Sequence, residues 1–301
     1  MSRPETVTLV EVGPRDGLQN EPHPIPAATK IALVERLADA GLGVVETTSF
    51  VSARWVPQMG DATEVLTGIR RRPGVRYPVL TPNLKGLERA IEAGADEVAV
   101  FAAASETFSQ RNTNASIEES FERFAPLIQR AQEDGVTVRG YVSCALGCPY
   151  EGAVPPQRVA EVAERLRRMG CFEISLGDTI GCGTPLEARR MVAHVAERVP
   201  PEHLALHFHD TRGQALANLF ACLDTGVATI DTAVGGLGGC PYAPGAAGNV
   251  ATEDVLYMLD GMGIDTGVDR AAVVAAAHWI AGELGQQPRS RVAAAESTCS
   301  A

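Results

Sequence analysis

Short apolar segments alternate with amphipathic segments along nearly the whole chain. The apolar segments are rich in β-branched residues and hold few polar positions, as expected for strands buried on both faces of a parallel sheet. Each is followed by a polar turn and by a stretch with apolar residues at three- and four-residue spacing, which is typical of a helix packed on a core. The predicted strands are Val7–Val12, Val44–Phe50, Tyr77–Thr81, Glu97–Ala102, Val136–Ser143, Phe172–Leu176, Leu204–His209 and Thr229–Val234.

The ends of the predicted helices carry recognisable signals. Ser116 with Glu119 three residues later has the capping-box pattern, and Thr184-Pro185 predicts an N-cap followed by proline at the first helical position. Glycine just past a helix end tolerates the left-handed conformation that closes the last turn. The predicted glycine stops are Gly41, Gly94, Gly135, Gly170, Gly226 and Gly263.

Eight strand–helix units in series predict an α/β fold, a (β/α)8 TIM barrel. An open doubly wound sheet is the alternative. A further stretch, Asp269–Leu284, adds one helix beyond the eight units. Because no Pro/Ser-rich linker divides the chain, we expect residues 1–301 to form a single catalytic domain, with a mobile tail from about residue 288.

The composition narrows the classes of partner and of chemistry that the chain can have. The formal net charge of -11 gives no electrostatic footprint for nucleic acid or for an anionic membrane. The longest apolar stretches are shorter than the roughly 18 residues that a membrane helix needs. Only Lys30 and Lys85 are lysines, so Schiff-base chemistry has two candidates, both in predicted helices.

The start of the chain and its cysteines bear on the compartment. Met1–Glu5 shows no targeting pattern, and the first strand begins at Val7. The seven cysteines are spread through mostly apolar segments, which fits free thiols better than a disulfide framework. We therefore expect a cytoplasmic protein. Cys299, in the predicted tail, is a candidate for an oxidation-sensitive crosslink.

Reactive residue types gather where the predicted strands end. In a parallel barrel the active site lies in the loops that follow the carboxyl ends of the strands. The candidates there are Arg15, Asp16 and Gln19 after the first strand, Glu46 and Ser49 at the end of the second, Asp178 after the sixth, His207 and His209 at the end of the seventh, and Cys240 and Asn249 after the eighth.

The segment His207-Phe208-His209 is the sharpest local signal. Side chains alternate along a strand, so both imidazoles point the same way. Alone, the pair is equally consistent with structural histidines. In a closed barrel the seventh, eighth and first strands are neighbours, so Asp16 and Asn249 would join the histidines. Two histidines with carboxylate and amide oxygens suit a divalent cation such as Mg²⁺ or Mn²⁺.

The loop after the last strand holds four glycines in five positions, Gly235-Gly236-Leu237-Gly238-Gly239, followed by Cys240. It matches neither a phosphate-binding loop nor a dinucleotide fingerprint. It is either an inert connection or a mobile lid that delivers a thiol. Arg15 would set a permanent cation beside the candidate metal ligand Asp16, where it could stabilise an oxyanion.

Seven stretches together resemble the 3-hydroxy-3-methylglutaryl-CoA lyase family: Val10–Pro22, Glu46–Asp61, Val79–Asn83, Tyr141–Gly152, Ser175–Thr184, His207–Asn218 and Gly236–Asn249. The resemblance implies cleavage of 3-hydroxy-3-methylglutaryl-CoA to acetoacetate and acetyl-CoA with a divalent metal, Mg²⁺ or Mn²⁺, and a place in leucine degradation and ketone-body metabolism. It also implies an acyl-CoA substrate and a homodimer.

The resemblance assigns roles to individual residues. It implies that Arg15 stabilises the enolate and that Cys240 acts on the proton given to that carbanion. The implied metal ligands are Asp16, His207, His209 and Asn249. The resemblance further implies an acid–base and metal-site network containing Glu46 and Asp178, and a pocket lined by Gln19 and Ser49.

Two positions depart from the family pattern. Arg212 stands where we expect tyrosine, and Cys182 where a small aliphatic residue is usual. These departures leave a lyase for a longer 3-substituted substrate as one alternative. A condensing synthase that uses acetyl-CoA and a 2-oxo acid is another, and a catalytically silent binding barrel is the alternative from outside the enzymes.

Overall fold

A ring of parallel strands forms the centre of the computed structural model, which describes residues 3–239 and 248–296. The strands follow the order β2-β1-β9-β8-β7-β6-β5-β4-β3. Their bounds are β1 (Thr8–Glu11), β2 (Val44–Val45), β3 (Thr48–Ser49), β4 (Val79–Leu80), β5 (Glu97–Ala103), β6 (Thr137–Ser143), β7 (Glu173–Asp178), β8 (Leu204–Phe208) and β9 (Thr229–Thr232).

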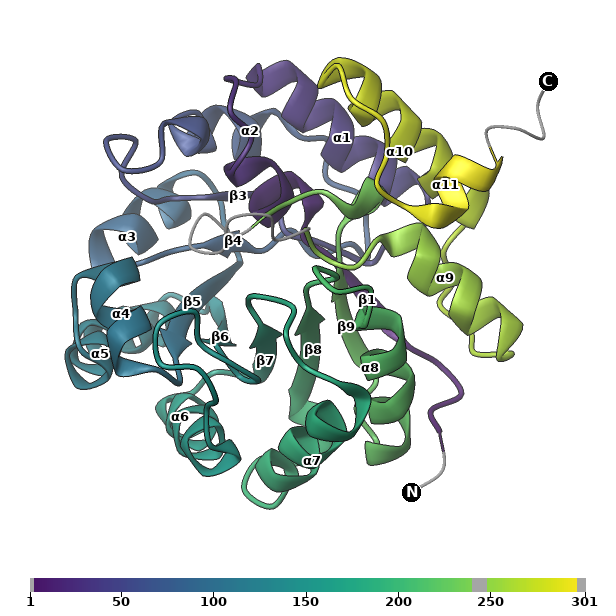
Figure 1. Ribbon diagram of the computed structural model, residues 1–301. Helices are drawn as coiled ribbons and strands as arrows, with labels where there is room; N and C mark the ends of the chain where they lie inside the picture. Colours follow the sequence, from purple (N-terminus) through teal and green to yellow (C-terminus); the bar gives the residue numbers. More distant parts are fainter. Residues whose placement is uncertain (1–2, 240–247, 297–301) are drawn as a thin grey trace.

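The sheet closes on itself through an interrupted strand. β2 and β3 stand at the two ends of the strand order, yet only Glu46 and Thr47 separate them in the chain. The Glu46 amide donates to the Glu11 carbonyl at 2.8 Å, and the Thr47 amide donates to the Pro78 carbonyl at 2.9 Å. This stretch therefore bonds to both neighbours and occupies one of eight strand positions, which confirms the predicted barrel (Figure 1).

Helices surround the ring (Figure 1). Their buried apolar side chains form one core cluster with those of the strands. The helices are α1 (Ala27–Asp39), α2 (Ala62–Gly68), α3 (Leu84–Glu92), α4 (Glu106–Thr113), α5 (Ile117–Glu133), α6 (Pro156–Met169), α7 (Pro185–Ala196), α8 (Ala215–Cys222), α9 (Thr252–Gly261), α10 (Arg270–Glu283) and α11 (Arg291–Glu296).

The predicted helix-end signals are present. Ser116 and Glu119 form the capping box of α5, and Thr184 is the N-cap of α7 with Pro185 at its first position. All six predicted stop glycines have positive φ. At Gly170, φ is 115° and a Cβ atom would lie 2.1 Å from the Gln132 amide nitrogen, so α6 can only end this way with glycine.

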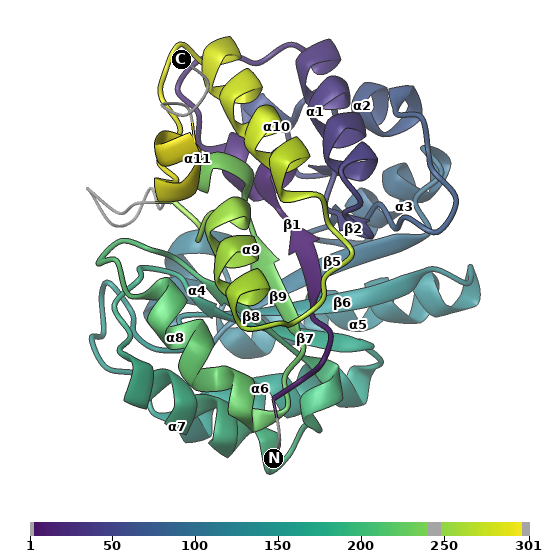
Figure 2. The same ribbon diagram turned by 90° about the vertical axis from the view of Figure 1, so that its right-hand side faces the viewer.

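The C-terminal region adds two helices to the barrel. The predicted additional helix is α10, capped by the Asp269 side chain, and it lies beside α1 (Figure 2). We expected a mobile tail from about residue 288, but the chain forms α11 there. Ala293 is fully buried against the protein, and the Asp254 carboxylate accepts hydrogen bonds from Ser290 and from the amides of Arg291 and Val292. These contacts anchor a segment whose small, polar composition predicted no packing.

Two further observations concern the helices and the cysteines. Within the described residues, none of the helices combines the length and hydropathy needed to cross a bilayer. Cys148, Cys171, Cys182 and Cys222 carry free thiols. Cys240 and Cys299 lie outside the described residues.

Candidate active site

A cavity of about 1360 Å³ opens at the carboxyl ends of the strands. Arg15, Asp16 and Gln19 reach it from the loop after β1, and His207 and His209 reach it from β8 and the residue beyond its end. The predicted site residues on these two segments are therefore brought to one place, although nearly 200 positions separate them in the sequence.

The two imidazoles converge on one carboxylate. The Nε2 atoms of His207 and His209 lie 3.9 Å and 4.0 Å from Oδ2 of Asp16. One ligand atom from each of these residues lies within 4.8 Å of the others, a spacing that a single cation can bridge. Asn249 adjoins them, because its Nδ2 donates to the same Asp16 oxygen at 2.9 Å.

The polar atoms of this group fit a hard or borderline divalent cation. Oδ1 of Asn249 is buried and has no hydrogen-bond partner among the described residues, so an oxygen ligand is available beside the carboxylate. Burial raises the pKa of Asp16, but Arg15, the two histidines and Asn249 outweigh it and lower the pKa to about 2. Burial, helped by nearby His207, lowers the pKa of His209 to about 4, so its ring is neutral at pH 7.

Arg15 links the candidate metal group to Glu46. Its Nη1 donates to Asp16 Oδ1 at 2.6 Å and its Nε donates to Glu46 Oε2 at 2.7 Å. The arginine side chain is 7% exposed. Burial raises the pKa of Glu46 even though Arg15 opposes that shift. A fixed cation therefore lies at the cavity between two carboxylates.

The Asp178 side chain makes its described hydrogen bonds with the loop after β7. It is fully buried at the end of β7, and its two oxygens accept from the amides of Cys182 and Gly183 at 3.1 Å and 2.9 Å. Burial raises the pKa of Asp178, and it raises the pKa of Cys182 to about 12. Arg212, like Cys182 a departure from the family pattern, donates to the carbonyls of Ile180 and Gly181. Both unusual residues therefore support this loop.

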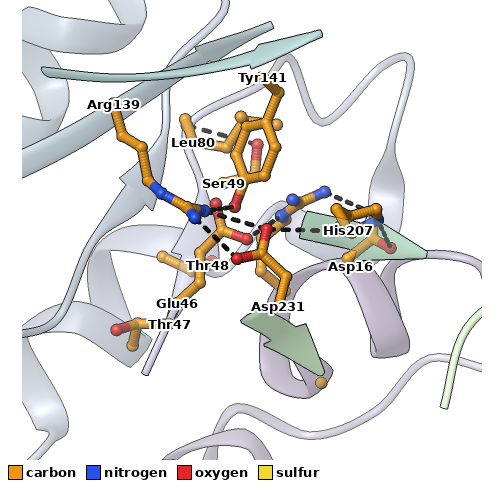
Figure 3. A network of polar contacts seen from close by, with 12 residues as sticks. Asp16, Glu46, Thr47, Thr48, Ser49, Leu80, Arg139, Tyr141, His207 and Asp231 are labelled. Atoms are coloured by element: carbon orange, nitrogen blue, oxygen red, sulfur yellow. Dashed lines mark hydrogen bonds and ion pairs between the residues drawn. The ribbon is translucent and has the colours of Figure 1, made fainter. Parts of the chain in front are cut away.

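The two predicted pocket residues differ in position. Gln19 lines the cavity, and its Oε1 is buried with no hydrogen-bond partner in the described part of the chain. Ser49 was expected to line the pocket, but it is fully buried and its hydroxyl donates to the Leu80 carbonyl of the next strand. It therefore supports the wall that Leu80 forms (Figure 3). Cys240, the predicted thiol, lies outside the described residues.

Sequence reasoning missed a polar network inside the barrel. Arg139 on β6 forms an ion pair with Glu173. It forms a second ion pair with Asp231 and donates to the Tyr141 hydroxyl (Figure 3). Tyr141 lines the cavity, and its ring packs edge-on against His207 with centroids 5.9 Å apart. The available signal was a charged residue in the middle of two apolar strand patterns, at Arg139 and Asp231.

Comparison with known proteins agrees with this geometry. The HMGL-like family model matches residues 6–280, and the chain belongs to this family. It is 60% identical to the 3-hydroxy-3-isohexenylglutaryl-CoA/hydroxy-methylglutaryl-CoA lyase of Pseudomonas aeruginosa, over 98% of each chain.

Solved structures give the same result. The crystal structure of hydroxymethylglutaryl-CoA lyase from Pseudomonas aeruginosa superposes with a TM-score of 0.97 at 59% identity, covering 99% of both chains. The HMG-CoA lyase from Acinetobacter baumannii, in complex with coenzyme A and 3-methylmalate, superposes with a TM-score of 0.94 at 38% identity, covering 98% of this chain and 96% of the other.

Proposed function

We propose that this protein is a carbon–carbon lyase that cleaves 3-hydroxy-3-methylglutaryl-CoA to acetoacetate and acetyl-CoA. The observation that carries the proposal is the convergence of Asp16, His207 and His209, with Arg15 beside them, at the mouth of one large cavity. Membership of the HMGL-like family, and relatives named for this activity, support the same reaction.

The residues that would hold the divalent cation, Mg²⁺ or Mn²⁺, are Asp16, His207, His209 and Asn249. The unpaired Asn249 oxygen and the mixed nitrogen and oxygen donor set support this assignment. A cation held there would supply Lewis acidity toward the tertiary hydroxyl of the substrate, which favours loss of its proton.

Side chains of the protein then stabilise the negative charge that develops and transfer protons. As the hydroxyl proton passes to a base, the role given to the acid–base network of Glu46 and Asp178, a carbonyl forms at C3, the C2–C3 bond breaks, and its electron pair passes to the acetyl-CoA fragment as an enolate. Arg15 stabilises the negative oxygen of that enolate. Cys240 then gives its thiol proton to C2. Glu46 holds Arg15 in place, Asp178 orders the loop after β7, and Gln19 contacts the substrate.

We further propose a cytoplasmic homodimer. Free thiols at Cys148, Cys171, Cys182 and Cys222 are consistent with a reducing compartment. Acetoacetate and acetyl-CoA as products fit a place in leucine degradation and ketone-body metabolism. Light scattering across a concentration series tests the dimer, and a constant monomer mass would contradict it.

A metal-dependent cleavage assay tests the reaction. Acetoacetate should form from 3-hydroxy-3-methylglutaryl-CoA after Mg²⁺ or Mn²⁺ is added to chelator-treated protein. His207→Ala and Cys240→Ala should each abolish most of the turnover, but only His207→Ala should also weaken binding of the cation.

Parallel assays separate the alternatives. No turnover of the methyl compound, with turnover of a longer 3-substituted analogue, would contradict the substrate assignment. Thiol release from acetyl-CoA and a 2-oxo acid would indicate a condensing synthase. Unchanged behaviour of both variants in every assay would indicate a binding barrel.

A further inference from the structure

Asp231 lies on β9 in the barrel interior, on the opposite side of His207 from Asp16. The residue is fully buried. Its Oδ2 lies 3.2 Å from Nδ1 of His207, while Nε2 of the same ring faces Asp16 at 3.9 Å (Figure 3). His207 is thus held between two carboxylates, one at each ring nitrogen.

The two histidines of the site differ in this respect. Nδ1 of His209 is buried and has no hydrogen-bond partner among the described residues. His209 therefore depends on strand geometry for its orientation, whereas His207 has a dedicated acceptor. A ring nitrogen that donates to a carboxylate leaves the other nitrogen with its lone pair, which is the form that binds a metal.

Arg139 holds the Asp231 carboxylate with two hydrogen bonds. Its Nη2 donates to Asp231 Oδ1 at 2.7 Å, and its Nη1 donates to Oδ2 at 3.1 Å. The Ser175 hydroxyl donates to the same Oδ2 at 2.8 Å. Both carboxylate oxygens thus accept hydrogen bonds, and Asp231 faces His207 as an acceptor as well.

We propose that Asp231 is a positioning residue that fixes His207 in the Nδ1–H tautomer and aims its Nε2 atom at the cation. The inference rests on the proposed metal site, because it explains how the tautomer and orientation of one metal ligand, His207, are set. Arg139 supports the arrangement indirectly by holding the Asp231 carboxylate in place across the barrel interior.

A purely structural role is the competing explanation. Asp231 also pairs with the buried Arg139, so any loss on mutation could reflect damage to the barrel core. Glu173→Gln is the matched control, because Glu173 is the other buried carboxylate on Arg139, at 2.7 Å from its Nε, and it makes no described contact with His207.

The experiment measures Mn²⁺ affinity by electron paramagnetic resonance, without substrate, for the wild type, Asp231→Asn and Glu173→Gln. An asparagine can turn its amide N–H group toward His207, which would favour the wrong tautomer. We expect Asp231→Asn to weaken Mn²⁺ binding by about 10- to 100-fold. Glu173→Gln should change the Mn²⁺ affinity by no more than about threefold, because Glu173 makes no described contact with His207 and its loss leaves that metal ligand unchanged.

A second measurement uses the wild type alone. Long-range ¹H–¹⁵N correlation at pH 8, in metal-free protein, distinguishes the two tautomers of each neutral histidine ring. His207 should carry its proton on Nδ1. This readout needs neither a variant that folds nor a bound metal, so it tests the inference even where the variant is unstable.

The outcomes separate this inference from the proposed function. An Nε2–H tautomer of His207, or equal losses of Mn²⁺ affinity in Asp231→Asn and Glu173→Gln, would overturn the positioning role. Wild-type protein that binds no Mn²⁺ would contradict the proposed metal site, while an Nδ1–H tautomer would still support the contact from Asp231.

Discussion

Two pairs of carboxylates in the barrel differ in their partners, and all four are buried except the partly exposed Asp16. Asp16 and Asp231, the guanidinium-paired carboxylates, contact Arg15 and Arg139, and the pKa of each lies below its ordinary value. Glu11 and Glu253, the amide-bound carboxylates, accept hydrogen bonds from backbone amides of the turn that begins the Gly-rich loop.

The pKa values of the amide-bound pair shift in the opposite direction. Burial raises the pKa of Glu11 to about 7 and that of Glu253 to about 8, because hydrogen bonds to neutral groups offset only part of the desolvation cost. Burial alone therefore does not identify a catalytic carboxylate. At Asp16 and Asp231 a guanidinium partner outweighs burial and keeps the carboxylate charged, whereas at Glu46, which also pairs with Arg15, burial outweighs the partner. The amide partners of Glu11 and Glu253 suit those carboxylates to holding a turn.

The largest expected effect is on turnover, and it comes from changing Arg15, the cation that pairs with Asp16. Lysine in Arg15→Lys keeps the charge but cannot bridge Asp16 and Glu46 with the arginine fork. We expect kcat for 3-hydroxy-3-methylglutaryl-CoA cleavage to fall by about 10²- to 10³-fold, the usual cost of losing one oxyanion-stabilising group. Steady-state kinetics at saturating Mn²⁺ measures this.

The control is the same substitution on an exposed arginine, Arg71→Lys, which should leave kcat unchanged. Arg71 contacts Gly94, Asp96 and the Tyr77 ring, and it is not among the residues that line the cavity. Full recovery of Arg15→Lys activity in excess Mn²⁺ would show that Arg15 acts only on metal affinity, and the enolate role would then be wrong.

The next effect concerns stability and the amide-bound pair. The ordinary pKa of Glu11 is 4.5 and burial raises it to about 7, so the folded state holds this proton more tightly than the unfolded state. The contribution of Glu11 to stability is therefore most favourable below pH 4.5 and declines as the pH rises to 7. The total decline corresponds to about 3 kcal/mol.

Glu11→Gln should remove this slope. Glutamine resembles the protonated acid: its oxygen can accept from the Gly13 and Val234 amides, and its N–H group can donate to the Thr252 hydroxyl. Urea unfolding at pH 5 and pH 8 should show a smaller loss of stability in the variant, by about 3 kcal/mol. Glu118→Gln, at an exposed position, is the control, and equal pH dependence of Glu11→Gln and the wild type would contradict the prediction.

The barrel could be predicted from the sequence because the signals for its strands and helices lie within short stretches of the chain. Buried parallel strands need continuous apolar runs, and helix ends need caps, so Ser116, Thr184 and Gly170 marked the element ends directly. Strand-end positions also brought His207 and Asp16 to one rim, because the closed order places β8, β9 and β1 side by side.

The interior network could not be predicted in the same way. Arg139 lies on β6 and Asp231 on β9, three positions apart in the ring, so their contact exists only because the closed barrel lets a side chain cross its interior. A polar residue within an apolar run signals an exception, but its partner depends on the register and on closure. The contact of Ser49 also depends on the register, because its hydroxyl donates to a carbonyl of the neighbouring strand.

The smallest expected effect concerns an arginine whose partners are backbone carbonyls. Arg212 is exposed, and its Nη1 donates to the carbonyls of Ile180 and Gly181 at 3.1 Å and 2.8 Å. Like the amide-bound carboxylates, a guanidinium whose described hydrogen bonds go to backbone carbonyls positions a loop and does not set chemistry. Arg212→Tyr, which restores the residue expected from the family, should change stability by about 0.5 kcal/mol or less.

The same variant tests whether this departure from the family pattern sets the substrate range. The ratio of kcat/KM for the methyl substrate to that for a longer 3-substituted analogue should change by no more than about twofold, because a surface substitution of this size has little effect on transition-state binding. Phe101→Ala, which alters an apolar wall of the cavity, is the contrasting variant and should change the ratio more. A larger change for Arg212→Tyr than for Phe101→Ala would show that the loop after β7, held by a surface guanidinium, selects the substrate.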